Sequence, residues 1–258
     1  MKQLNNSSTP KGRKVSKRRI LFFLFLILAV IASILFLYLK RTVDQERKQD
    51  KIEKEITTER EKDGVGNLHK KYKDVIGWLE IKGTGFSYPV MQTGIEGHHK
   101  DDWQYYLHRD VHGEYSFYGT PFLDVRCTTD SDNLIIYGHN MKNGTMFADL
   151  NKYKDKEFYE SHKEVQFDTL TEEGKYKVVY AFVTEVNKKD SFKYYEKINW
   201  NSNNEFNEYV SNLEQRKLYD TGEKIKKKDK LLTLSTCEKV SDNSRMVVVC
   251  KKSKINDR

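Results

Sequence analysis

One uncharged run of twenty residues constrains this chain more than any other feature. Residues 20–39 read ILFFLFLILAVIASILFLYL and contain no Asp, Glu, Lys or Arg. As a helix that rises about 1.5 Å per residue, the run would be about 30 Å long, which matches the hydrocarbon thickness of a bilayer. We therefore predict a transmembrane signal-anchor helix at 20–39. A cleaved signal peptide is the alternative, but its apolar region is typically roughly 7–15 residues long and ends at a small-residue cleavage site.

The charges around this run predict its orientation. Nine of the 46 basic residues lie in residues 1–41, seven of them before the apolar run, and this region has no acidic residue. By the positive-inside rule, residues 1–19 form a basic cytoplasmic tail and the rest of the chain lies outside the cell, as in a single-pass protein of the cell membrane. The rest of the chain has 37 basic and 38 acidic residues, so its net charge is close to zero. This balance does not favour a nucleic-acid partner, and we expect none.

Beyond the apolar run, composition divides the chain into a charged stalk at 40–70 and a domain at 71–258. The stalk alternates charge signs and contains good helix formers, so a solvated helix and a flexible tether both fit it. The domain is mainly β. Eight segments rich in β-branched and aromatic residues are predicted as strands, at 74–81, 86–92, 119–125, 133–139, 163–170, 175–186, 230–237 and 245–252. So many short strands predict a closed barrel or a sandwich, with peripheral helices at 145–162 and 203–219.

Three residues with useful chemistry lie at predicted strand ends. His139 follows the apolar run LIIYG, Cys237 ends LLTLSTC, and Arg245 opens the last strand. A thiol is a strong nucleophile when a nearby base or cation favours the thiolate, and a histidine transfers protons near neutral pH. An arginine donates a fork of hydrogen bonds that suits a developing oxyanion. Each residue alone is most often structural. The histidine and the cysteine are 98 positions apart, and this separation carries no information about their distance in space.

Taken together, these motifs resemble the sortases, the membrane-anchored cysteine transpeptidases of Gram-positive bacteria. The resemblance rests on TLSTC with an arginine eight positions later and on YGHN upstream, and it extends to WLEI, YPVMQ, YYLHRD and GTPFLD. It is strongest with class B, because of the N-terminal anchor, the stretch IIYGHNM…GTMF and the helix-bearing insertion before the cysteine strand. It covers about residues 72–252.

The resemblance implies a closed eight-stranded sortase-type β-barrel and a thiol-dependent mechanism. Cys237 would attack the carbonyl after the threonine of a C-terminal sorting signal on a secreted protein and form a thioester. An amine of the peptidoglycan precursor would then resolve it and anchor the protein to the cell wall. His139 would serve as general acid/base, and Arg245 would position the substrate and stabilise the oxyanion. The resemblance implies no cofactor and no metal.

Other residues have weaker assignments. By resemblance, Ser235 and Glu238 would line the site of the substrate threonine and Leu107 the apolar wall of the groove, although a strand hydroxyl, a solvated carboxylate and a core leucine are equally ordinary readings. No residue in the sequence is identified as the group that orients His139. Cys127 and Cys250 match no catalytic motif, and a disulfide between them is an alternative to two buried thiols.

Two other functions fit the same residues. A related cysteine protease would hydrolyse the thioester instead of transferring it to an amine. A membrane-tethered binding module would use the groove without any chemistry, and its Cys237 would be unreactive. Product analysis with and without an added amine separates the first from a transpeptidase, and labelling by a thiol-reactive substrate mimic tests the second.

Overall fold

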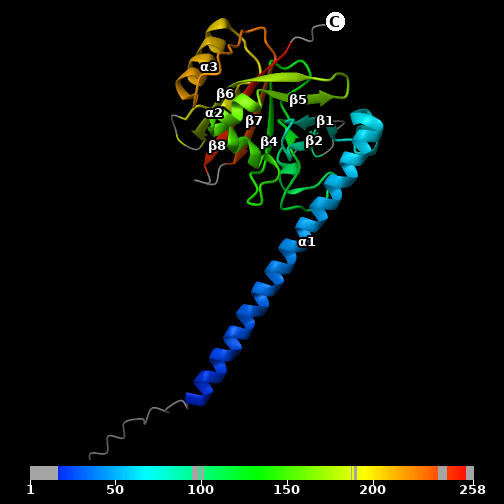
Figure 1. Cartoon of the computed structure of the whole chain (residues 1–258), viewed down its shortest axis with the longest axis vertical. Coiled ribbons are helices and arrows are strands. Elements are labelled where there is room, and N and C mark those ends of the chain that lie inside the picture. The colour runs from blue at the N-terminus through cyan, green and yellow to red at the C-terminus, as the bar shows by residue number, and fades with distance from the viewer. Residues whose placement is uncertain are drawn as a thin grey trace, which may run out of the picture. The chain divides into compact units, whose positions relative to one another are not determined.

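The computed structural model describes residues 17–94, 99, 102–186, 188, 191–237 and 243–253, and at Cys237 the backbone alone. The chain forms two compact units, Met1–Lys48 and Gln49–Arg258. Helix α1 (Lys17–Lys71) contributes to both, and at Gly64 its backbone leaves the helical conformation with φ 73°. The sequence of the stalk fits both a helix and a flexible tether. In the structure, residues 40–70 belong to α1 and are helical except at Gly64 (Figure 1).

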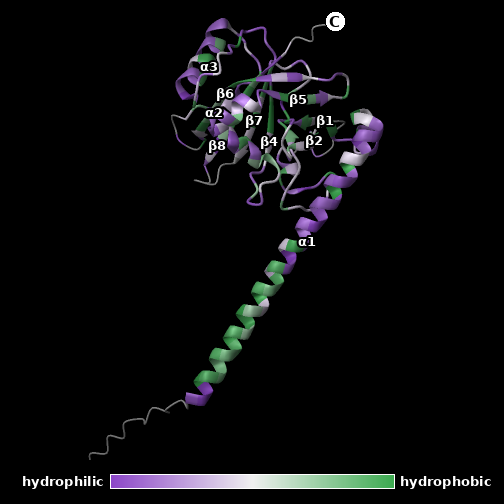
Figure 2. Cartoon of the chain, viewed as in Figure 1, coloured by the Kyte–Doolittle hydropathy of each residue, from purple (hydrophilic) through white to green (hydrophobic). Residues whose placement is uncertain are grey.

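The N-terminal part of α1 is apolar on all sides, as Figure 2 shows. Its large hydrophobic side chains from Ile20 to Leu39 are exposed. Within the described part of the chain, this is the one helix with the length and hydropathy needed to cross a bilayer. The described residues of its unit all belong to α1 itself and leave these side chains exposed.

The second unit contains a closed eight-stranded barrel, which confirms the predicted fold class. Its strands follow the order β1-β2-β3-β4-β7-β8-β6-β5. Their bounds are β1 (Val75–Glu80), β2 (Ser87–Met91), β3 (Phe122–Leu123), β4 (Asn133–Gly138), β5 (Glu164–Thr169), β6 (Lys175–Glu185), β7 (Leu231–Cys237) and β8 (Ser244–Lys252). The β2–β3 and β4–β7 pairs are parallel and the other pairs are antiparallel.

The prediction for residues 119–125 was too long, because β3 is only two residues. The single helix predicted at 145–162 was also wrong. The structure has a 3₁₀ helix, η3 (Phe147–Lys154), and a short α-helix, α2 (Lys156–Ser161). Asp155 divides them because its extended backbone ends η3, and its carboxylate caps α2 by accepting a hydrogen bond from the backbone N–H of Glu157.

Two further clusters pack outside the barrel core. The insertion between β6 and β7 contains η4 (Tyr194–Glu196) and α3 (Asn203–Arg216), and its aromatic residues cover β6, β7 and β8. On another side, Ile52 and Ile56 of α1, one helical turn apart, pack with Trp78 of β1. Both clusters pack against the strands of the barrel. The residues predicted as catalytic lie elsewhere, at the ends of β4 and β7 and at the start of β8.

Candidate active site

The strand pairing by itself brings the three predicted catalytic residues to one edge of the barrel. β4 and β7 run parallel, with Gly138 opposite Thr236, so His139 and Cys237 follow at the same level. β8 returns antiparallel to β7, with Arg245 directly opposite Cys237. Opposed residues in an antiparallel pair have Cα atoms about 4.5–5.5 Å apart. Residues far apart in sequence thus become neighbours through main-chain hydrogen bonding.

The His139 ring is held by a main-chain carbonyl. Its Nε2 lies 2.7 Å from the carbonyl oxygen of Leu107, in the 3₁₀ helix η2 (Tyr105–His108). Because a carbonyl can only accept, Nε2 must carry the proton, and the neutral ring is the Nε2–H tautomer. Nδ1 is then the nitrogen that can accept or return a proton. The orienting group that sequence did not identify is therefore the backbone of Leu107.

The backbone on either side of His139 is fixed as well. The carbonyl of His139 accepts from the N–H of Phe147 at 2.8 Å, and the carbonyl of Gly138 accepts from the hydroxyl of Thr236 at 2.8 Å. A Cβ at Gly138 would lie 2.5 Å from the ring of Phe147. The strand ends in glycine because no larger residue fits between it and this ring, and Thr236 ties that end to the residue before Cys237.

Burial sets the proton affinity of His139. The pKa of its imidazole is lowered, mainly because burial disfavours the charged form, and the nearby His108 lowers it further. The bond to the Leu107 carbonyl acts in the opposite direction but does not reverse the shift. The two imidazole rings have centroids 5.2 Å apart. His139 is therefore mostly neutral at physiological pH and able to act as a base.

A groove of about 680 Å³ lies at this edge of the barrel. Leu107, Ser235 and Arg245 all line it, as their predicted roles require. The other lining residues are Trp103, Gln104, Phe122, Asp124, Val125, Arg126, Tyr137, Gly138, Val186, Tyr194, Tyr195 and Glu196. The mixture of aromatic walls and a few polar groups is typical of a site that binds a peptide or small ligand.

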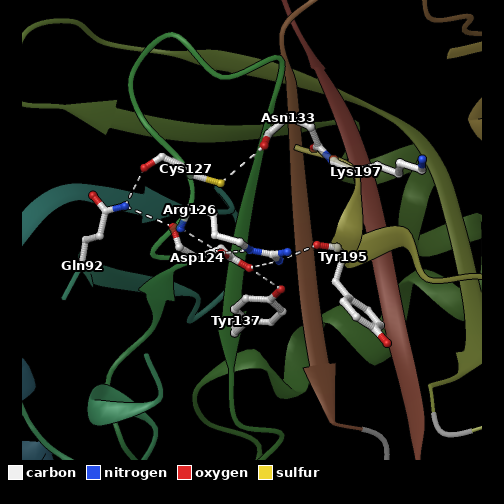
Figure 3. A network of polar contacts seen from close by, with 8 residues as sticks. All are labelled: Gln92, Asp124, Arg126, Cys127, Asn133, Tyr137, Tyr195 and Lys197. Atoms are coloured by element: carbon white, nitrogen blue, oxygen red, sulfur yellow. Dashed lines mark hydrogen bonds and ion pairs between the residues drawn. The ribbon is translucent and has the colours of Figure 1, made fainter. Parts of the chain in front are cut away.

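An ion pair between Asp124 and Arg126, which both line the groove, joins separate parts of the chain (Figure 3). Arg126 donates to both carboxylate oxygens of Asp124, from Nε at 2.9 Å and from a terminal nitrogen at 2.7 Å. The same guanidinium donates to the carbonyl of Tyr195 at 2.7 Å, and the hydroxyl of Tyr137 donates to Asp124 at 3.0 Å. This pair holds the loop after β3 against β4 and against the insertion.

The remaining predicted residues have different outcomes. Ser235 is buried, and its hydroxyl lies 2.6 Å from that of Tyr194, so it is part of the groove wall. Glu238 lies outside the described residues. The structure shows Cys127 and Cys250 as free, buried thiols, so the alternative of a disulfide between them was wrong. Burial raises the pKa of Cys127 to about 12 and raises that of Cys250 as well, so neither is a reactive thiolate.

The sequence did not predict the polar residues of the groove lining, Asp124, Arg126, Tyr137 and Tyr194. Asp124 ends the motif GTPFLD and Tyr137 begins YGHN, but neither motif indicates an ion pair, and Tyr194 lies in no motif. A carboxylate two residues before an arginine was the one local signal for the ion pair. Nothing local indicated that Tyr194, in the insertion, reaches Ser235.

The comparisons with known proteins agree with this geometry. A family model described as "Sortase domain" matches residues 79–253. Sortase B of Listeria monocytogenes is 37% identical over 193 residues, which cover 72% of this chain and 73% of that protein. Two solved structures have TM-scores of 0.65. One is a Staphylococcus aureus sortase B–substrate complex at 27% identity, covering 84% of this chain and 98% of that one. The other is a sortase B complexed with triglycine at 28% identity, covering 84% and 99%.

The family match covers more than half of the chain, and the relatives share both sequence and barrel. The chain belongs to the sortases, as a class B sortase, a cysteine transpeptidase that acts in cell-wall anchoring.

Proposed function

We propose that Cys237, His139 and Arg245 carry out the transpeptidase reaction at the edge of the barrel. The observation that supports this assignment most directly is the strand register, which pairs Cys237 with Arg245 and places His139 one step beyond the Gly138–Thr236 pair. The groove supplies the place for a peptide beside them.

In the proposed reaction, the Cys237 thiol gives its proton to Nδ1 of His139, and its sulfur attacks the carbonyl carbon after the threonine of a sorting signal. Arg245 stabilises the negative oxygen of the tetrahedral intermediate. The intermediate collapses to a thioester, and the same proton passes from Nδ1 to the departing amine. An incoming amine then attacks the thioester and loses a proton to Nδ1. The Cys237 sulfur leaves as a thiolate and takes this proton back from Nδ1, which restores the thiol and the neutral His139.

The proposed substrates are secreted proteins with a C-terminal sorting motif, and the proposed acceptor is an amine of the peptidoglycan precursor. The sortase B–substrate complex and the sortase B complexed with triglycine support a peptide donor and an amine-bearing acceptor. Groove-wall residues Leu107 and Ser235 would contact the sorting signal, together with Glu238.

The site also requires a location at the cell surface. We propose that residues 20–39 anchor the chain in the cell membrane in a single pass, with residues 1–19 in the cytoplasm, 40–70 as the stalk and 71–258 as the extracellular catalytic domain. The fully apolar surface of this part of α1 supports the anchor. Protease treatment of intact cells tests the topology, since only a domain outside the cell would be digested.

A peptide-library assay tests the chemistry. Wild-type protein should cleave a subset of peptides and, with triglycine added, form the amide product. Cys237→Ala should form no thioester. His139→Ala and Arg245→Ala should each lose several orders of magnitude in kcat/KM, on the order of 4 kcal/mol or more. Thioester formation by Cys237→Ala would reject the assignment, and hydrolysis with no amide product at any amine concentration would make the protein a protease.

A further inference from the structure

Met146 has a strained backbone close to the proposed general base. Its φ is 57° and its ψ is −133°, a combination that is unfavourable for a residue with a Cβ. His99 is the other non-glycine residue with positive φ in the described part of the chain. Strain of this kind persists only where the surrounding structure enforces it, and it is concentrated at functional sites.

Met146 closes the loop that begins at His139. Asn140 and Met146 form an antiparallel bridge, and the next residue, Phe147, donates its N–H to the carbonyl of His139. The seven residues from Asn140 to Met146 therefore leave the barrel and return beside the histidine. The direction of the Phe147 N–H, and with it the position of the His139 backbone, depends on the conformation of Met146.

Two other elements hold Met146 in this conformation. Its N–H donates to the hydroxyl of Tyr88, in β2, at 2.8 Å. Its side chain is 2% exposed, and its sulfur lies 3.9 Å from Nε2 of Gln49, in α1. The Tyr88 hydroxyl is itself buried, and this burial raises the pKa of Tyr88.

We propose that Met146 is a positioning residue for His139, held by the Tyr88 hydroxyl from within the barrel and covered by Gln49 of α1. The inference rests on the proposed role of His139 as the proton-transfer group. The Leu107 carbonyl fixes the imidazole, and the Phe147 amide fixes the main chain that carries it. Met146 controls the second of these contacts. It lies outside the groove, as does Tyr88, so it acts through His139 and not on the substrate.

The test compares two tyrosine variants in the full-length protein. Tyr88→Phe removes the acceptor of the Met146 amide. Tyr159→Phe is the matched control, because Tyr159 is equally buried and its hydroxyl also contacts the main chain, at the carbonyl of Thr221, but away from His139. Two readouts are taken: kcat and KM for the peptide selected from the library, and the ¹⁵N spectrum of the histidine side chains, which reports the tautomer of His139 without any substrate.

Tyr88→Phe should lower kcat by about tenfold to a hundredfold with KM unchanged, as expected for a misplaced catalytic group. It should also reduce the fraction of His139 in the Nε2–H tautomer. Tyr159→Phe should leave both readouts at wild-type values. Gln49→Ala, which removes the cover of the sulfur without changing the barrel, should shift both readouts in the same direction as Tyr88→Phe but by less.

Wild-type kcat and an unchanged tautomer in Tyr88→Phe and Gln49→Ala would overturn the inference, and so would equal losses in Tyr88→Phe and Tyr159→Phe. If Tyr88→Phe does not fold, Gln49→Ala decides by the same two readouts. His139→Ala is measured in parallel. An active His139→Ala would reject the proposed function, whereas an inactive His139→Ala beside a fully active Tyr88→Phe would reject the positioning role alone.

Discussion

His139 donates a hydrogen bond from Nε2 to the carbonyl oxygen of Leu107 over 2.7 Å, and this contact decides which ring nitrogen is available for chemistry. With the proton on Nε2, only Nδ1 can exchange a proton with Cys237 or an amine. An acid or amide side chain performs the orienting role in many catalytic triads. Here a main-chain carbonyl performs it, so no substitution of a side chain removes it directly.

The acid limb of the pH profile should report His139. Because burial and then His108 lower the pKa of His139, the limb of kcat/KM should lie below the ordinary histidine value of about 6.5. His108→Gln removes the neighbouring imidazole that lowers the pKa of His139, so this pKa should rise and the limb should move to higher pH. The shift should be less than about one pH unit, since the rings are 5.2 Å apart and His108 is exposed. His112→Gln, an exposed histidine of the same loop region, is the control and should leave the limb in place.

Arg245 should not be replaceable by lysine. Arg245→Ala should lower kcat/KM by about 10³-fold or more, because it removes an oxyanion donor and a substrate-positioning group together. Arg245→Lys keeps the charge but loses the planar fork, so it should recover little of that activity. Lys227→Ala removes an exposed cation from the loop before β7 and should have wild-type kinetics. Full activity of Arg245→Lys would show that charge alone is sufficient.

Gly138→Ala should disrupt the histidine strand. The added Cβ would lie 2.5 Å from the ring of Phe147, which must move and take its amide away from the carbonyl of His139. We expect a loss of about 1–3 kcal/mol in the free energy of unfolding, measured by denaturant titration, and a large loss of kcat. The matched control is Gly66→Ala in α1, where no atom lies within 4 Å of the new Cβ, and alanine should be neutral or slightly stabilising.

The ion pair between Asp124 and Arg126 should make the stability of the protein depend on pH. Burial raises the pKa of Asp124, but hydrogen bonds from Arg126 and Tyr137 outweigh it, and the net pKa is lowered. A lowered pKa contributes stability above the unfolded value of about 3.9, and this contribution is lost as the pH falls further. Asp124→Asn should therefore cost about 1–3 kcal/mol at pH 7, and the difference from wild type should shrink below about pH 4.

Asp130→Asn provides the control for this measurement, because Asp130 is exposed and its carboxylate makes no contact among the described residues. At pH 7 its unfolding free energy should stay close to that of the wild type. A difference between wild type and Asp124→Asn that stays constant from pH 7 to pH 3 would contradict the assigned ion pair.

Only one of the three cysteines should react in the native protein. The raised pKa values of Cys127 and Cys250 keep both as buried thiols, whereas the proposed role of Cys237 requires a thiol that the groove exposes. Mass spectrometry after brief iodoacetamide treatment at pH 8 should find a single label, at Cys237, and all three cysteines should be labelled after denaturation. Native labelling of Cys127 would contradict its burial.

Local sequence patterns predicted the strands well and the details between them poorly. Segments such as LIIYG and LLTLSTC are apolar and β-branched over a whole strand, so their state depends little on context. Residues 145–162 have a helical composition, but the cap at Asp155 divides them, because a side chain that accepts from the backbone competes with a continuous helix. β3 is short because it pairs with β2 only at Phe122 and with β4 only at Phe122 and Leu123.

The sequence by itself determined the chemistry this protein can perform, because the types of residue at the strand ends, a thiol, an imidazole and a guanidinium, are set residue by residue. Tertiary structure alone decided how they are used. The parallel pairing of β4 with β7 brings the strand ends before His139 and Cys237 side by side, the carbonyl of Leu107 contacts Nε2 of His139, and the amide of Phe147 contacts the carbonyl of His139. These contacts involve main-chain atoms that every residue possesses, so no pattern of side chains could have revealed them.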